Sequence, residues 1–235
     1  NLINEREKNG KYKFLMDFIK RVSSRDINKL QLEGLVKSGA FDEIEVNRKK
    51  LIDAIPKIIQ LNKIFNDDKI SNQSSLFDEE SNTETESFVF ASENNWKKKE
   101  LLNEEFKSLG FYISDHPLNE YRSLFSQLNI ITFKDFVSND KNEGFVSGTL
   151  MSIQEKKSSK GVPFGIAKFS DNSGEFELFL FSEILVKNRE ILNEGESFVL
   201  TLYKDSNAIQ KRINVKKIIS VSELMTRDYK EVLIE

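Results

Sequence analysis

The sequence contains no cysteine, which excludes disulfide bonds, thiolate metal sites and thiol nucleophiles. Histidine occurs once, as His116, so a polyhistidine metal site is excluded and a Ser-His-Asp triad would need that one residue. No apolar run approaches the roughly 18–20 residues that cross a membrane, and no basic and then apolar leader opens the chain. The sequence therefore predicts a cytoplasmic protein with no membrane partner.

What the sequence does contain is charge in opposed blocks, although the net charge is only −3. Residues 1–65 carry 14 Lys and Arg against 9 Asp and Glu, and residues 66–95 carry one Lys against eight acidic residues. Residues 144–220 carry 11 basic residues against 9 acidic ones. A basic N-terminal segment and a mildly basic C-terminal segment are thus separated by an acidic one. The net charge of the whole chain does not reveal this pattern.

The front of the chain has helical periodicity. Apolar residues spaced by three and four predict helices over 14–22, 30–36 and about 47–64, with Pro56 expected to kink the third or shift its start. Residues 66–95 lose this period and are typical of a solvated linker, interrupted by two apolar islands at 76–77 and 88–90. A charged helix from Trp96 to Gly110 and a helix that starts at Pro117 predict a helical connector over 96–143.

From Gly144 the period changes to two. Strands are predicted over 145–153, 164–169, 175–181, 197–203 and 208–219, with a hairpin turn at 172–174 and a helix over 183–192. Five strands with a helix between the third and the fourth is the order of an OB-fold, a small barrel. The predicted fold class is therefore multi-domain α + β: a helical module over 1–65, a linker, a connector, a five-stranded OB-fold β-barrel over 144–220 and a tail over 221–235.

Three stretches carry a resemblance to a known family. They are residues 28–42 with Asn47-Arg48, residues 109–118 (Leu-Gly-Phe-Tyr-Ile-Ser-Asp-His-Pro-Leu), and Lys160-Gly161 with residues 169–177 and Phe181. In this order they resemble the C-terminal part of the alpha (catalytic) subunit of bacterial DNA polymerase III. The resemblance implies a helix-hairpin-helix module, a linker that tethers a sliding clamp, and an OB domain. It also implies that the polymerase carboxylates, and the Mg that the parent nucleotidyltransferase is expected to use, lie outside this chain.

The resemblance implies a DNA contact at the turn after the second helix. Helix-hairpin-helix turns direct backbone N–H groups at a phosphate, independently of sequence, and Gly39 and Ala40 occupy this turn. Four nearby cations are candidates for further phosphate contacts: Lys37, Arg48, Lys49 and Lys50. The alternatives are a plain helix connection and a solvated basic face.

The predicted OB domain offers a second DNA site. Lys156, Lys157 and Lys160 cluster on its first long loop, where they can follow a single-stranded backbone, and Lys168 lies on the second strand. An exposed aromatic, Phe164 or Phe179, would stack a base. The alternative is that both rings belong to the barrel core, because alternation alone does not say which face is outside.

The linker contains the sharpest short motif. Gln73, Ser74, Ser75, Leu76 and Phe77 resemble the clamp-binding pentapeptide of bacterial polymerases, with Ser74 at a position that is often apolar in that family. The alternative packs Leu76 and Phe77 back on the helical module.

His116 precedes Pro117 at a helix start and is expected to be a structural hydrogen-bonding residue, since no partner nucleophile can be identified. No catalytic residue, metal site or cofactor is assigned in this chain. The preferred hypothesis is a non-catalytic fragment of a replicative polymerase that binds duplex DNA, single-stranded DNA, the sliding clamp and other replisome subunits. The alternatives are a free-standing single-stranded nucleic-acid-binding OB module and an enzyme that uses His116.

Overall fold

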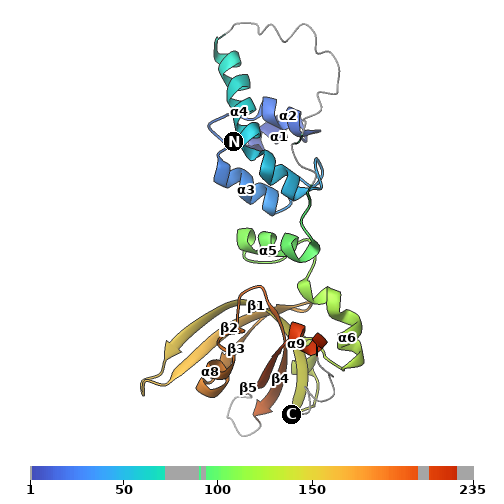
Figure 1. Ribbon diagram of the computed structural model, residues 1–235, viewed down its shortest axis with the longest axis vertical. Coiled ribbons are helices and arrows are strands. Elements are labelled where there is room, and N and C mark those ends of the chain that lie inside the picture. Colours follow the sequence, from blue (N-terminus) through green and yellow to red (C-terminus); the bar gives the residue numbers. More distant parts are fainter. Residues whose placement is uncertain (1, 72–89, 91–93, 206–211, 227–235) are drawn as a thin grey trace. The chain divides into compact units, whose positions relative to one another are not determined.

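The structure, a computed structural model, describes residues 2–71, 90, 94–205 and 212–226, and the chain forms two units. The first comprises Asn1–Ser114 and the second Asp115–Glu235. Within the described residues the first unit is helical and the second contains the sheet (Figure 1). The predicted helical connector over 96–143 is therefore divided between the two units.

The first unit contains five helices in its described part, α1 (Leu2–Asn9), α2 (Leu15–Arg21), α3 (Lys29–Lys37), α4 (Arg48–Ser71) and α5 (Lys98–Leu109). Asn28 caps α3 by accepting a hydrogen bond from the N–H of Gln31 at 2.9 Å. Helix α4 runs through Pro56 instead of starting there and extends to Ser71, beyond the predicted end. No sequence pattern predicted α1, which has no buried residue and is fixed by tertiary contacts.

The core of the first unit lies where α2, α3 and α4 pack together. The ring of Phe18 meets Tyr12 at 5.2 Å and Phe41 at 4.9 Å, both edge to face. The buried Asn62 of α4 donates to the carbonyls of Ile19 and Val22 at 2.8 Å and so satisfies the end of α2. The other core side chains are mainly aliphatic: Leu15, Met16, Ile19, Val22, Ile27, Leu32, Val36, Leu51, Ala54, Ile55 and Ile58.

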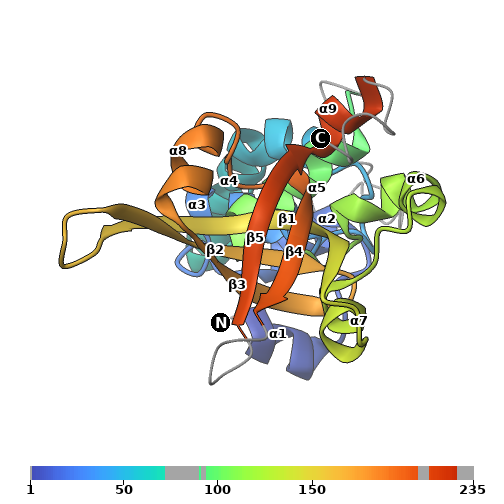
Figure 2. The ribbon, with the colours of Figure 1, turned by 90° about the horizontal axis from the view of Figure 1, so that it is seen from below.

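The second unit is built on an antiparallel sheet with the strand order β3-β2-β1-β4-β5. The strands are β1 (Glu143–Lys157), β2 (Pro163–Asp171), β3 (Gly174–Leu180), β4 (Ser197–Asp205) and β5 (Arg212–Ser220). The two outer strands, β3 and β5, contact each other, and α8 (Ser182–Asn188) packs against β2, β3 and β5 (Figure 2). This is an OB-like fold, as the sequence predicted, and the multi-domain α + β class is confirmed.

Short helices cover the rest of this sheet. They are η1 (Pro117–Tyr121), α6 (Arg122–Gln127), α7 (Phe133–Ser138) and α9 (Val221–Thr226). Phe136 of α7 is fully buried in the sheet's core, although the sequence did not predict that helix. Strand β1 is longer than predicted and has a register shift between Leu150 and Ser152. The predicted start of the fifth strand, residues 208–211, lies outside the described residues.

His116 has the structural role that the sequence predicted. Its Nδ1 accepts a hydrogen bond from the N–H of Leu118 at 3.2 Å and caps η1, and its Nε2 lies 3.1 Å from Oγ of Ser170. Burial lowers the pKa of His116, although the carboxylates of Asp171 and Asp115 act in the opposite direction. The neutral ring is therefore the form that the fold stabilises.

Replacing this histidine should change the pH dependence of stability. Because the folded-state pKa lies below the unfolded one, the unfolded chain binds the proton first, and stability falls as the pH drops below about 6.5. His116→Asn retains a cap acceptor without titrating, so its free energy of unfolding should lose this pH component. His116→Ala should cost about 0.5–2 kcal/mol at pH 7.5. Urea unfolding followed by circular dichroism measures both. Parallel pH profiles for His116→Asn and the parent would show that the ring does not titrate as inferred.

Candidate nucleic-acid interface

The turn between α3 and α4 has a defined backbone geometry. Gly39 adopts φ +81°, and the N–H of Ala40 donates to the carbonyl of Leu35 at 3.0 Å, which ends α3. Asn47 caps the following helix, since its Oδ1 accepts from the N–H of Lys50 at 3.0 Å. We call residues 38–47 the hairpin. A positive φ at Gly39 is the conformation that the hairpin requires at this point.

Arg48 holds the hairpin from inside. Its side chain is buried, with a residue exposure of 3%, and all five of its N–H donors are engaged. It forms a two-pronged pair with Asp42 at 2.9 and 2.7 Å and donates to the carbonyl of Lys37 at 2.9 Å. It also donates to Glu105 at 3.0 Å and to Oγ of Ser114 at 2.9 Å. The predicted phosphate contact is therefore wrong for Arg48, because the buried guanidinium already has an internal partner for each donor.

Glu105 is the matching anion on α5. It is fully buried and accepts the N–H groups of Ile113 and Ser114 at 2.6 and 2.9 Å, besides the hydroxyl of Ser114 and the guanidinium of Arg48. Burial alone would raise the pKa of Glu105, but these hydrogen bonds outweigh it and lower the pKa. The pair of Arg48 and Glu105 thus joins the hairpin, the start of α4, α5 and residues 113–114.

The other predicted cations flank the hairpin and remain at the surface, each with a nearby carboxylate. Lys37 pairs with Glu104 at 2.8 Å, and Lys49 pairs with Asp53 one turn along α4. Lys50 pairs with Glu45 at 3.2 Å and lies 4.2 Å from the ring centre of Phe90. A phosphate would have to compete with these partly exposed pairs, which are individually weak. Their DNA contact stays a prediction.

On the second unit, the predicted lysine loop is exposed. Lys156 and Lys157 end β1, Lys160 follows in the turn to β2, and within the described ranges none of the three has an ion-pair partner. The nearest carboxylate in sequence, Glu155, is engaged by Arg189 at 2.9 and 2.8 Å. The β1–β2 ribbon that bears these lysines projects from the rest of the sheet (Figure 2).

The outward face of β2 and β3 carries aromatic rings. Phe179 is 51% exposed, and its ring lies 6.4 Å from that of the half-buried Phe164, with an angle of 25° between the planes. Lys168 lies on the same side of β2 and pairs with Glu175 at 2.6 Å. Of the alternatives left open by the sequence, the structure therefore selects the outward one for Phe179.

A second exposed ring was missed in the sequence. Phe181, at the start of α8, is 54% exposed. It lies two residues after Phe179, so the alternation of β3, which buries Phe176, Leu178 and Leu180, would have placed it outward.

The predicted clamp motif, Gln73, Ser74, Ser75, Leu76 and Phe77, lies outside the described residues. The described residues on either side both belong to the first unit, since α4 ends at Ser71 and Phe90 packs against the core of the helices. The described residues before and after the acidic segment therefore belong to the same unit.

Within the described ranges, no group of three or more His, Asp or Glu side chains is placed to hold a metal ion, and no helix is long and apolar enough to span a bilayer.

The chain is similar to one motif family and to several known proteins. Residues 1–51 match the helix-hairpin-helix motif family, so the chain combines this motif with an OB-like domain. It is 32% identical over 94% of its length to DNA polymerase III subunit alpha of Rickettsia prowazekii, and 34% identical over 95% to that of Borreliella burgdorferi. The chain is thus similar over nearly its whole length to a part of DNA polymerase III subunit alpha. It spans about one fifth of the length of these relatives.

One solved structure, RecG bound to a three-way DNA junction, aligns with 88% of this chain over 31% of its own length, with a TM-score of 0.27 and 15% identity. That similarity is too low to indicate a shared fold.

The geometry of the hairpin predicts a large cost for Gly39→Ala. A Cβ at this position would lie against Nη2 of Arg48 and 2.8 Å from Oδ2 of Asp42, in addition to the strain of φ +81°. The matched control is Gly110→Ala, with φ +79° and nothing within 4 Å of the added Cβ. The control should lose about 1 kcal/mol, and Gly39→Ala more than about 2 kcal/mol, in urea unfolding followed by the fluorescence of the single tryptophan, Trp96. Equal losses would contradict the close approach of Arg48.

Proposed function

We propose that this chain is a non-catalytic part of a replicative DNA polymerase, which holds DNA and the sliding clamp while the chemistry takes place elsewhere in a longer protein. The observation that carries this proposal is the outward pair of Phe164 and Phe179 beside three lysines without ion-pair partners in the described part of the chain. The relationship to DNA polymerase III subunit alpha supports it. In this proposal, the catalytic residues and the Mg that they use lie in parts of the polymerase outside this chain. The protein would act in the cytoplasm.

The helical unit is proposed to hold duplex DNA. The match to the helix-hairpin-helix motif supports this, since such turns bind phosphate through backbone N–H groups without reading sequence. Gly39 and Ala40 would supply these groups, with Lys37, Lys49 and Lys50 at the surface around them. Arg48 acts indirectly, because it fixes the hairpin from the interior.

The second unit is proposed to hold single-stranded DNA along β1, β2 and β3. An exposed ring stacks any base, and lysines beside it follow the backbone, which together give binding without sequence preference. Lys156, Lys157 and Lys160 would contact phosphates, and Phe179 would stack a base. The adjacent Lys168 is held by Glu175, so its contribution would require that pair to open.

The clamp is proposed to bind Leu76 and Phe77, with Gln73 fixing the register and Ser74 and Ser75 between them. Burying each apolar side chain contributes roughly 1.5–3 kcal/mol, and ordering the segment takes part of this back. Since Ser71 and Phe90 both belong to the helical unit, the motif between them would be carried by that unit. DNA held nearby would then raise the effective concentration of the encircling clamp.

The single-strand site makes a prediction that separates stacking from charge. Phe179→Ala should weaken binding of oligothymidine by about 1–3 kcal/mol with no change in salt dependence. Replacing Lys156, Lys157 and Lys160 by Ala should lower the slope of log affinity against log salt by about 0.7 for each phosphate that the variant no longer neutralises. Fluorescence anisotropy over a salt series measures both effects.

Matched controls for this experiment lie elsewhere on the same unit. Lys134→Ala removes an exposed lysine of α7, and Tyr203→Ala a partly exposed ring of β4. Both should bind oligothymidine as the parent does. If the controls weaken binding as much as the site variants do, or if the site variants have no effect, DNA does not bind on this face.

For the clamp, changing Leu76 and Phe77 together to Ala should reduce affinity at least 100-fold and leave DNA binding nearly intact. The matched control replaces Asn82 and Thr83 of the same segment by Ala, which removes no apolar anchor and should bind the clamp as the parent does. Surface plasmon resonance on immobilised clamp measures this. Unchanged clamp binding by the first variant would place the tether elsewhere, with the island at Phe88, Val89 and Phe90 as the next candidate.

A further inference from the structure

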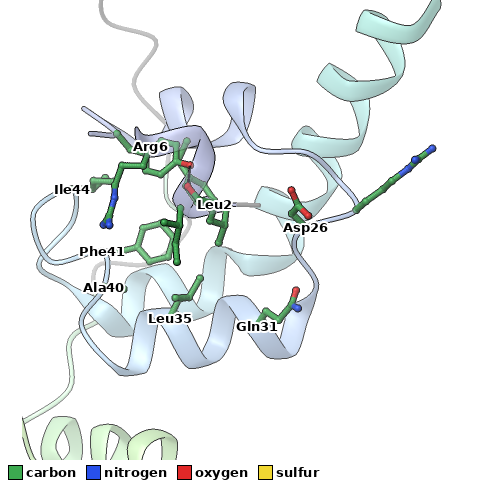
Figure 3. Close-up of a pocket in the computed structure, with 12 residues that line it drawn as sticks. Leu2, Arg6, Asp26, Gln31, Leu35, Ala40, Phe41 and Ile44 are labelled. Carbon is green, nitrogen blue, oxygen red and sulfur yellow. Dashed lines mark hydrogen bonds between the residues drawn. The ribbon is translucent and has the colours of Figure 1, made fainter. Parts of the chain in front are cut away.

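The helical unit contains a cavity of about 540 Å³ that the proposed function does not use. Its walls come from α1, α3 and the hairpin, with Leu2, Leu35 and Ile44 among the lining side chains (Figure 3). A volume of this size is in the range that binds small ligands or a few side chains.

The cavity is built on a rigid frame. Phe18 and Phe41 at its base are buried and meet edge to face at 4.9 Å. The wall formed by α1 is fastened by the hydroxyl of Tyr12, which donates to the carbonyl of Leu2 at 3.2 Å, and by Arg21, which donates to Glu5 at 2.6 Å. A wall held in this way is preorganised, so a ligand would not have to order it.

Two arginines at the rim of the cavity do not take part in the contacts that stabilise the fold. Arg6 and Arg25 are exposed, and neither guanidinium has a hydrogen-bond or ion-pair partner among the residues that the structure describes. This contrasts with Arg21, whose donors are taken by Glu5, Asp17 and backbone carbonyls. The side chain of Arg6 runs along the cavity, with its guanidinium beside the ring of Phe41 (Figure 3).

The lining favours a peptide over a nucleic-acid base. Both phenylalanine rings at the base are 5% exposed or less and face each other edge to face, so neither offers an open face for stacking. The accessible apolar part of the lining is mainly aliphatic, with Ile3 56% exposed. Aliphatic walls with an arginine at the edge suit an apolar side chain followed by carboxylates.

We propose that this cavity binds an acidic peptide segment of a partner protein, with one or two large apolar side chains inserted between α1 and α3 and the neighbouring carboxylates paired with Arg6 and Arg25. The site lies apart from the predicted hairpin cations Lys37, Lys49 and Lys50, none of which lines the cavity. Ala40, which the proposed duplex contact uses, does line the cavity, so peptide and duplex DNA would meet at this edge of the helical unit.

The test uses the whole chain and a fluorescein-labelled hexapeptide in which Leu and Phe are flanked on each side by two acidic residues. We expect saturable anisotropy with this probe and none with a counterpart that has lysines in place of the acidic residues. Arg6→Glu and Ile3→Asp should each weaken binding about tenfold, and circular dichroism should confirm that both variants are folded. The matched charge reversal Lys63→Glu, on the exposed side of α4 away from the cavity lining, should bind within twofold of the parent.

Two results would overturn the proposal. Equal binding by the parent and by folded Arg6→Glu and Ile3→Asp would place the peptide elsewhere. Displacement of the probe by oligothymidine, with DNA binding abolished in Arg6→Glu, would make the cavity a nucleic-acid site instead.

Discussion

The helical unit depends on one buried ion pair, that of Arg48 with Glu105. Taking two charges out of water costs several kcal/mol, and the cost is recovered only when every donor and acceptor is matched. Here all five guanidinium donors have acceptors, and Glu105 accepts from two backbone N–H groups as well. The pair therefore fixes the hairpin against α5, and only a glycine at position 39 leaves room for it.

Arginines and lysines differ in the contacts that they make in the described residues. Arg48 and Arg21 serve the fold of the first unit, while Glu155 of the second unit is taken up by Arg189. What remains outside is mostly lysine, on either side of the hairpin and on the β1–β2 ribbon. Lysine suits phosphate contact without sequence reading, because it presents a mobile point charge. Arg6 and Arg25 depart from this pattern, since they border an aliphatic cavity instead of packing into the fold.

Sequence patterns predicted those helices and strands that are determined by the residues within them. The apolar spacing of α2, α3 and α4 and the alternation of the strands indicated the helical module and the OB-like sheet. Helices α1 and α7 were missed because distant contacts stabilise them, such as Arg21 with Glu5 and the burial of Phe136 under the sheet. Arg48 was misassigned for the same reason: its acceptor Glu105 lies 57 residues further along the chain. The outward direction of Phe179 required the pairing of β2 with β3.

A double-mutant cycle on Arg48 and Glu105 tests the central claim most directly. The free energies of unfolding of the parent, Arg48→Met, Glu105→Met and the double variant are compared by the fluorescence of Trp96. Arg48→Met leaves the buried Glu105 without a cation and should lose about 3–5 kcal/mol. Glu105→Met leaves Arg48 paired with Asp42 alone and should lose less, and the double variant should lose far less than the two losses together. Additive losses below about 1 kcal/mol each would contradict the account, because they would describe two independent surface charges.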